Sequence, residues 1–212
     1  MNKLLRYLFF LVLVRPVVLL LLGVNVHHRH RLPQQGPAII IANHNSHLDT
    51  LILMNLFPYR LLPFLRPVAA ADYFLRNRFL AWFSKHIIGI IPITRSRSTQ
   101  NVDPLKEISQ ALLQKEIVIF YPEGTRGEPE QLAQFKSGIA HLASRHPDIP
   151  IFPVFLYGAG KALPKGEALL VPFVIDIQIG NPLSWSGDKH QFIEILEHVF
   201  ADFADKVKQQ DF

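Results

Sequence analysis

The fold is decided by the stretch Ala38-Ile39-Ile40-Ile41-Ala42-Asn43-His44-Asn45-Ser46-His47-Leu48-Asp49. Its first five residues are small or β-branched and apolar, which predicts a buried strand over 38–42. Polar residues follow at once, and a helical pattern then begins over 46–57. A strand that runs straight into a helix opens a βα unit, and His44 falls at the junction.

The same alternation continues to the end of the chain. Strands are predicted over 38–42, 67–71, 89–94, 117–121, 151–157 and 171–179, and helices over 46–57, 73–86, 102–114, 131–146 and 189–207. Repeated βα units favour an α/β fold with a mostly parallel or mixed sheet flanked by helices. Ligands of such sheets bind beyond the carboxyl ends of the strands, so site residues are sought there.

Residues 1–36 differ in character from the α/β domain predicted over 37–212. The run from Leu4 to Val26 is almost wholly apolar, but Arg6 and the pair Arg15-Pro16 interrupt it. A simple spanning helix needs roughly 18 apolar residues, and a central arginine would cost about 2.5 to 3.5 kcal/mol. We therefore expect two short helices that lie in the membrane interface, followed by a basic cluster (27–31) at headgroup level.

Three other interpretations of this segment stay open. Lys3 and Arg6 ahead of an apolar run are typical of a secretory signal peptide, although no small-residue cleavage site follows Leu22. A helix that is hydrophobic all round is typical of a buried core helix. The histidines of 27–31 are potential metal ligands, although no acidic ligand accompanies them.

Composition and charge exclude several classes of protein. The chain has 212 residues, 49% of them hydrophobic, and a positive mean hydropathy, so it is not disordered. It has no cysteine, which excludes disulfides, a thiolate nucleophile and iron–sulfur clusters. Residues 1–97 hold 12 of the 22 basic residues but only 2 of the 17 acidic ones. Because these cations alternate with aliphatic runs, the expected partner is an anionic membrane and not a nucleic acid.

The first candidate site is the pair His44 and Asp49. An imidazole accepts a proton near neutral pH, and a carboxylate bonded to its other nitrogen fixes the tautomer. Residues five positions apart do not lie on the same face of a helix. His44 must therefore lie in the loop and fold back onto the first helical turn to meet Asp49. Two alternatives remain: Ser46 and Asp49 form a helix capping box, or His44 and His47 bind a metal ion.

The second candidate site follows the strand predicted over 117–121. Glu123, Gly124, Thr125 and Arg126 come directly after it, and Lys136 follows ten residues later. A guanidinium and an ammonium together suit a phosphate group, and a glycine lets backbone amides approach an anion. The alternative is a surface turn with a weak ion pair between its glutamate and its arginine. A third cation, Arg95, follows the strand over 89–94.

Several familiar catalytic motifs are missing from the sequence. It contains no G-x-S-x-G elbow, no P-loop, no G-x-G-x-x-G after a strand and no H-E-x-x-H. Covalent serine catalysis, nucleotide hydrolysis and zinc proteolysis are therefore disfavoured.

Four ordered blocks resemble those of the 1-acyl-glycerol-3-phosphate acyltransferase family. They are N-H-x4-D at 43–49, G-x-x-P-I-x-R at 89–95, Y-P-E-G-T-R at 121–126 and I-P-I-F-P-V at 149–154. The resemblance covers about 37–182. Tyr121 stands where the family usually has phenylalanine, Thr94 where an acidic residue often precedes the arginine, and Gly127 where serine is common.

The resemblance implies a role for each matching residue. His44 would be the general base and Asp49 its partner, while Arg95, Glu123, Gly124, Thr125, Arg126 and Lys136 would surround the glycerol phosphate. Pro153 would shape the acyl-donor region. The implied reaction moves a fatty acyl group from acyl-CoA or acyl carrier protein to lysophosphatidate, with no cofactor and no metal ion.

The location that the resemblance implies is the cytoplasmic face of the inner or plasma membrane. Three alternatives are kept: another lysophospholipid or a lyso-aminolipid as acceptor, a hydrolase that uses the same histidine, and a lipid-binding or lipid-transfer module without turnover. Consumption of thioester separates the last of these from the enzymes.

Overall fold

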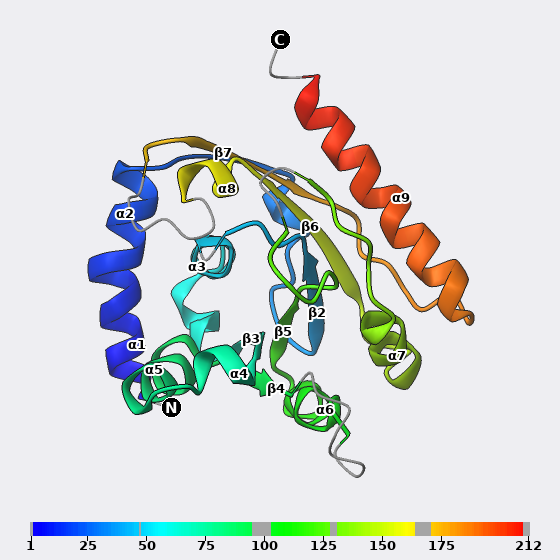
Figure 1. Ribbon diagram of the computed structural model, residues 1–212, viewed down its shortest axis with the longest axis horizontal. Helices are drawn as coiled ribbons and strands as arrows, with labels where there is room; N and C mark the ends of the chain where they lie inside the picture. Colours follow the sequence, from blue (N-terminus) through cyan, green and yellow to red (C-terminus); the bar gives the residue numbers. More distant parts are fainter. Residues whose placement is uncertain (1, 47, 95–102, 128–130, 164–170, 210–212) are drawn as a thin grey trace.

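The computed structural model describes residues 2–46, 48–94, 103–127, 131–163 and 171–209. Its strands are β1 (Gly23–His27), β2 (Ala38–Ala42), β3 (Leu65–Ala70), β4 (Ile91–Ile93), β5 (Ile117–Phe120), β6 (Ile151–Tyr157) and β7 (Val174–Ile179). Within the described ranges they form a seven-stranded sheet in the order β1-β7-β6-β2-β5-β3-β4 (Figure 1). Neighbours are parallel except for β6 and β7. The predicted α/β fold with a mostly parallel or mixed sheet is confirmed.

Helical segments connect the strands. They are α1 (Lys3–Phe9), η1 (Phe10–Val14), α2 (Arg15–Leu20), η2 (Arg29–Arg31), α3 (Leu48–Asn55), η3 (Tyr59–Phe64), α4 (Ala71–Phe74), α5 (Arg78–Phe83), η4 (Ser84–Ile88), α6 (Lys106–Leu113), α7 (Gly138–Arg145), α8 (Ala159–Ala162) and α9 (Lys189–Lys208). The elements η1 and η4 are π-helical turns, and η2 and η3 are 3-10 helices.

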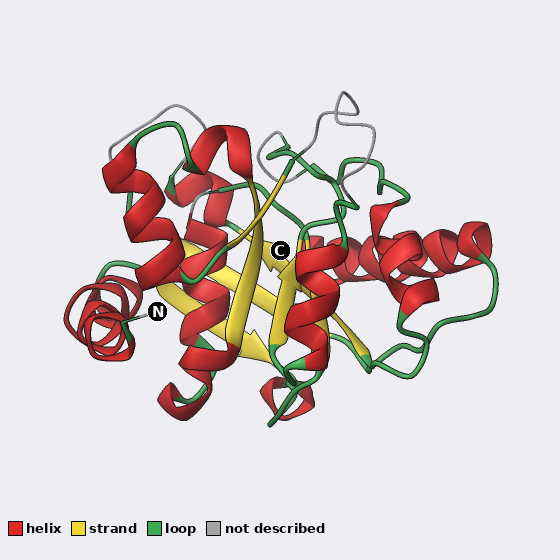
Figure 2. Cartoon of the chain, turned by 90° about the horizontal axis from the view of Figure 1, so that it is seen from below, coloured by secondary structure: helices red, strands yellow, loops and turns green. Residues whose placement is uncertain are grey.

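Helices cover both faces of the sheet, as Figure 2 shows. Side chains alternate along β2: Ala38, Ile40 and Ala42 pack on one face, and Ile39 and Ile41 pack on the other. The first face is covered by α2, α3 and the segment before α2, and the second by α6, α7 and α9. Every residue of β2 is fully buried. Because His44 follows this central strand, the core itself holds the site in place.

The structure divides or shortens several predicted elements. The single helix expected over 73–86 is split among α4, α5 and η4, because the side chain of Asn77 accepts a hydrogen bond from Leu80 N–H at 2.7 Å and starts a new helix. The helix expected over 131–146 begins only at Gly138. The strand expected over 89–94 is reduced to β4. Hydrophobic periodicity locates these elements but does not mark their caps.

The N-terminal segment differs from the two interfacial helices expected. One helical rod runs from Lys3 to Leu20, and the π turn η1 joins its halves just before Pro16. Proline has no N–H to donate to the helix. The π turn, in which Arg15 N–H donates to Phe10 C=O, is wider than an α-helical turn and accommodates the proline. The following residues, β1, form a parallel pair with β7 and not a helix. Their alternating valines suit an edge strand.

The rod has one buried side and one exposed side. Phe10, Val14, Val18 and Leu22 recur every four residues, are at most 5% exposed and pack on the sheet. Large apolar side chains on the other side reach 81% exposure at Leu20. The interpretation as a buried core helix thus holds for one side of the rod and not for the other. None of the helices in the described ranges has both the length and the hydropathy needed to cross a membrane.

Three arginines of this segment donate hydrogen bonds to backbone carbonyls. Arg6 is 1% exposed, and its Nη2 donates to Leu65 O at 2.9 Å and to Ile88 O at 3.0 Å. Burial is the main cause that lowers its pKa to about 10. Arg29 donates to Leu56 O, and Arg31 donates to Ile179 O. These three charges therefore fasten the segment to the sheet.

Candidate functional site

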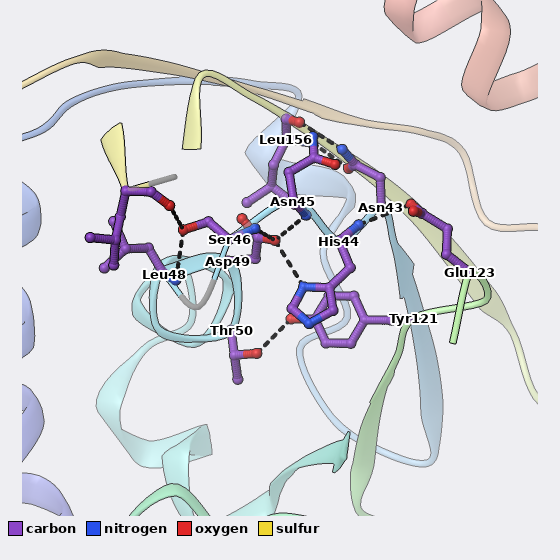
Figure 3. A network of polar contacts seen from close by, with 11 residues as sticks. Asn43, His44, Asn45, Ser46, Leu48, Asp49, Thr50, Tyr121, Glu123 and Leu156 are labelled. Carbon is purple, nitrogen blue, oxygen red and sulfur yellow. Dashed lines mark hydrogen bonds and ion pairs between the residues drawn. The ribbon is translucent and has the colours of Figure 1, made fainter. Parts of the chain in front are cut away.

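His44 and Asp49 meet at the carboxyl end of β2. The chain leaves the strand, folds back at His44 and enters α3, so that Nδ1 of the imidazole lies 2.9 Å from Oδ2 of Asp49 (Figure 3). The side chain of Asp49 is 1% exposed and that of His44 is 20% exposed. An ionised carboxylate only accepts hydrogen bonds, so Nδ1 carries the proton and Nε2 carries the lone pair.

The same carboxylate oxygen also caps α3. Asp49 Oδ2 accepts the backbone N–H of Asn45 at 2.7 Å and that of Ser46 at 2.8 Å. Ser46 Oγ accepts Leu48 N–H at 3.3 Å, which gives α3 its side-chain cap. Capping and orientation of His44 are therefore not alternatives, because one oxygen serves both. The metal pair with His47 falls outside the described residues.

Two segments from elsewhere in the chain clamp the backbone around His44. Glu123 Oε1 accepts His44 N–H at 3.0 Å, and Gly127 N–H donates to His44 C=O at 2.9 Å. On the other side, the amide of Asn43 forms two 2.8 Å hydrogen bonds with the backbone of Leu156 in β6. Each main-chain polar group of His44 thus has a partner in the loop after β5.

The carboxyl group of Glu123 is buried, with only 2% of the residue exposed. Burial, with a smaller contribution from the charge of Asp49, raises the pKa of Glu123 to about 7. Its Oε2 has no hydrogen-bond partner among the described residues. The surface ion pair with Arg126 considered for this turn is not among the ion pairs of the described residues.

Tyr121 forms the floor of the site. Its ring stacks on the imidazole of His44 with centroids 4.2 Å apart and planes at 22°. Its hydroxyl lies 2.8 Å from Thr50 Oγ1 in α3. Burial and the nearby charge of Asp49 hold the pKa of the Tyr121 hydroxyl well above its usual range, so the phenol stays neutral. The stack restricts how the imidazole can turn.

The loop after β5 brings two of the predicted cations near the site. Gly124 has φ +72°, and its N–H donates to Tyr121 O within the turn, so this amide is not available to an anion as expected. A Cβ on Gly124 would lie 3.0 Å from Lys136 Nζ, which places the ammonium beside the turn. The guanidinium carbon of Arg126 lies 6.0 Å from the ring centroid of Tyr73. Thr125 is exposed.

Two predicted residues do not join this group. Arg95 lies outside the described residues. Pro153 is buried in β6, where a Cβ placed on Gly180 would lie 2.7 Å from its Cγ and 2.8 Å from Phe203 of α9. Ile41, two residues before Asn43, is its partner in the sheet register. The described contacts of Pro153 are thus on the α9 face.

Sequence reasoning missed several residues that build the site. Asn43, Thr50 and Tyr73 were not singled out, and Tyr121 was noted only as a departure from the family pattern. Tyr121 had a signal, because it is the last residue of the strand predicted over 117–121, and site residues are sought at the carboxyl ends of the strands. Tyr73 had none, since its contact with Arg126 joins segments that are far apart in the sequence.

Known proteins are similar in sequence to this region. The family model described as Acyltransferase matches residues 23–157. The 1-acyl-sn-glycerol-3-phosphate acyltransferase alpha of Mus musculus is 30% identical over 171 residues, 77% of this chain and 56% of that protein. A chloroplastic 1-acyl-sn-glycerol-3-phosphate acyltransferase of Arabidopsis thaliana is 28% identical over 170 residues, 77% of this chain and 44% of that protein. The chain spans about half the length of these relatives.

One solved structure shares the fold over nearly the whole chain. It is the 1-acyl-sn-glycerophosphate (LPA) acyltransferase PlsC of Thermotoga maritima, with a TM-score of 0.77 and 20% sequence identity. The match covers 97% of this chain and 79% of that one. The mixed sheet and its flanking helices are thus an arrangement seen before.

Proposed function

The chain belongs to the acyltransferase family, and from that premise we propose that it transfers a fatty acyl group from a thioester to the free hydroxyl of lysophosphatidate, giving phosphatidate. The observation that carries the proposal is the 2.9 Å contact between His44 Nδ1 and Asp49 Oδ2. It leaves a basic nitrogen at the carboxyl ends of the central strands. The names of the relatives support lysophosphatidate as the acceptor.

The chemistry follows from the tautomer of His44. Nε2 takes the proton of the acceptor hydroxyl while the hydroxyl oxygen attacks the thioester carbonyl carbon. A C–O bond forms, the tetrahedral intermediate collapses, and the C–S bond breaks. The imidazolium then returns its proton to the departing thiolate. Asp49 stabilises the imidazolium between these steps, and no acyl-enzyme is required.

Two cations suit the phosphate of the acceptor. Arg126 offers a planar fork of donors and Lys136 offers a point charge, and neither has a carboxylate within 4.0 Å among the described residues. Both belong to the segment that also clamps His44. An acceptor held by its phosphate would therefore be held relative to the base. Arg95 is proposed as a third cation on the resemblance alone.

Glu123 is assigned a different role from the one the resemblance implies. Its buried carboxyl supports the main chain of His44 and does not present a charge to solvent. We assign it as a positioning residue, together with Asn43 and Gly127. Pro153 stays a proposal for the donor region, and acyl-CoA and acyl carrier protein stay open as donors.

The proposal includes attachment to an anionic membrane on its cytoplasmic face. The exposed side of the N-terminal rod supports this, because Leu4 is 68% exposed, Val12 is 69% exposed and Leu20 is 81% exposed. The lipid acceptor would then reach the site from the membrane surface.

The test is thioester consumption by the membrane-bound protein with and without lysophosphatidate. We expect consumption to require the acceptor and to be lost in His44→Ala. The matched control is His198→Ala, which removes a solvent-exposed imidazole of α9. Full activity in His44→Ala would sink the proposal.

The acceptor site has its own readout. Arg126→Ala should raise the KM for lysophosphatidate and leave the KM for a phosphate-free monoacylglycerol unchanged. Equal effects on both acceptors would contradict the phosphate role. Release of free fatty acid without acceptor would favour a hydrolase, and liposome binding without thioester consumption would favour a lipid-binding module.

A further inference from the structure

Helix α5 exposes two large aromatic side chains at the surface. Phe79 is 75% exposed and Trp82 is 44% exposed. Single exposed apolar residues are common, but contiguous ones mark an interaction site. No interpretation of the sequence assigned a function to this helix, which was expected only as a covering element of the sheet.

These aromatics form a row that begins in the core. The ring of Phe10, fully buried, lies 5.6 Å from that of Phe9; Phe9 lies 5.2 Å from Phe83; and Phe83 lies 6.4 Å from Phe79. Arg6 ties the rod to the end of η4 through Ile88 O. Helices α1 and α5 lie side by side in Figure 1. The exposed end of the row is therefore rigidly mounted beside the rod.

The rod continues this apolar surface. Leu5 and Val12 lie four residues before and three residues after Phe9, on the same side of the rod, and they are 39% and 69% exposed. Together with Phe79 and Trp82 they define what we call the α1–α5 face. Two elements distant in the sequence thus contribute to one exposed apolar surface.

Exposed cations lie in or next to helix α5. Arg76, Arg78 and Lys85 flank or belong to the helix, and the sequence from 73 to 93 contains no acidic residue. Within the described ranges, none of the three lies within 4.0 Å of a carboxylate. Apolar and aromatic side chains with a basic rim match the boundary between acyl chains and anionic headgroups. An acidic protein would match the rim but not the aromatic centre.

The same segment reaches the candidate site. The guanidinium carbon of Arg76 lies 5.1 Å from the ring centroid of Tyr73, and that of Arg126 lies 6.0 Å from the same centroid. Tyr73 therefore links the start of α5 to the loop that clamps His44. A surface that contacts α5 would lie next to the proposed phosphate site.

We propose that α5 is a second membrane-docking element, which lies in the headgroup region of an anionic bilayer beside the N-terminal rod and holds the acceptor site at the membrane surface. The inference deepens the membrane attachment within the proposed function and rests on it. It commits to a lipid bilayer as the occupant of the α1–α5 face.

The two tryptophans of the chain supply a direct test. In Trp185→Phe the remaining indole is Trp82, and vesicles of phosphatidylglycerol with brominated acyl chains should quench it and shift its emission to the blue. In Trp82→Phe the remaining indole is Trp185, which packs 5.4 Å from Phe192 of α9 on the other face of the sheet. That indole should not be quenched.

A binding measurement complements the quenching. Phe79→Glu should weaken sedimentation with these vesicles at least about tenfold, since the variant loses an apolar side chain that the bilayer would bury. The matched control is Leu113→Glu on α6, whose leucine is 77% exposed, and it should change binding less than twofold. The fluorescence measurement does not depend on how the glutamate variant folds.

The remaining outcomes overturn the inference in distinguishable ways. Vesicle binding without quenching of Trp82 would remove α5 from the membrane and leave the rod attached. If the protein did not bind vesicles at all, membrane attachment would be refuted for both the rod and α5. Acyl transfer to detergent-dispersed lysophosphatidate would then show whether the proposed chemistry still stands. If Phe79→Glu changed self-association but not vesicle binding, the face would be a contact between two copies of the chain.

Discussion

Replacing Asp49 by asparagine should separate two tasks of this carboxylate. Three donors converge on Oδ2, namely Nδ1 of His44 and the backbone N–H groups of Asn45 and Ser46. An asparagine must place its amide oxygen there, because its NH2 group would face two fixed N–H donors. The amide nitrogen then takes the position of Oδ1, which has no partner in the described residues. The productive tautomer of His44 is kept, and only the negative charge is lost.

The loss of transition-state stabilisation caused by removing that charge can be estimated from the geometry. At about 4 Å, opposite charges near a protein surface interact by about 4 kcal/mol, and the 20% exposure of the imidazole reduces this. A loss of about 2 to 4 kcal/mol corresponds to a decrease in kcat of roughly 30- to 1,000-fold. Asp49→Ala removes the acceptor as well as the charge, so we expect a decrease of about 10⁴-fold.

The assay is thioester turnover at saturating lysophosphatidate, with urea unfolding of each variant to verify folding. Asp49→Ser provides a comparison, because its side chain keeps a polar oxygen but is too short to reach the imidazole, so it should lose as much activity as Asp49→Ala. The reasoning is wrong if Asp49→Asn is as damaging as Asp49→Ala, since the oxygen would then not occupy the Oδ2 position. Full activity in Asp49→Asn would show that the charge plays no part.

Three further predictions concern the groups around the site. Glu123 has a pKa of about 7 in the folded protein, above its ordinary value of 4.5, so folding retains a proton that the unfolded chain releases, and stability falls as pH rises from about 4.5 to about 7. The free energy of unfolding, measured with urea at pH 5 and pH 8, should fall by about 3 kcal/mol less in Glu123→Gln than in the wild type. The prediction is contradicted if wild type and variant differ by the same amount at both pH values. Arg6→Met leaves two buried carbonyls without their donor and should lower the free energy of unfolding by about 2 to 4 kcal/mol, less the cost of burying the charge; an unchanged urea midpoint would refute the fastening role. Gly124→Ala puts a Cβ at φ +72° and 3.0 Å from Lys136 Nζ, so it should destabilise the protein by about 1 kcal/mol and raise the KM for lysophosphatidate, whereas an unchanged KM would mean that Lys136 does not contact the acceptor.

Local patterns in the sequence account for the elements that are buried on both faces. The prediction of a strand over 38–42 is confirmed to the residue, because five consecutive small or β-branched apolar residues are typical of a strand that is buried on both faces. The fold-back of His44 onto Asp49 was expected as the condition for the two side chains to meet, because residues five positions apart do not share a helix face. Both results depend on residues within a dozen positions of one another.

Edges and divided helices were harder to predict. The strand β1 was assigned to a helical segment because its alternation is short and its strand partner, β7, lies about 150 residues away. The helix expected over 73–86 was drawn through Asn77, because a cap that forms inside an amphipathic pattern does not disturb its periodicity. In these places the competing local preferences are nearly equal, and packing decides between them.

What the sequence alone determined is the family and the order of the six strands β2 to β7, and its pattern proposed His44 and Asp49 as a base and its partner. Only the tertiary structure decided that Glu123 turns inward to hold His44, that Tyr121 lies under the imidazole, and that Arg6 is buried in a segment that was expected to lie in the membrane interface. Each of these is a contact between residues that are more than 50 positions apart in the chain. Local pattern cannot specify such contacts, because they depend on which strands become neighbours in the sheet.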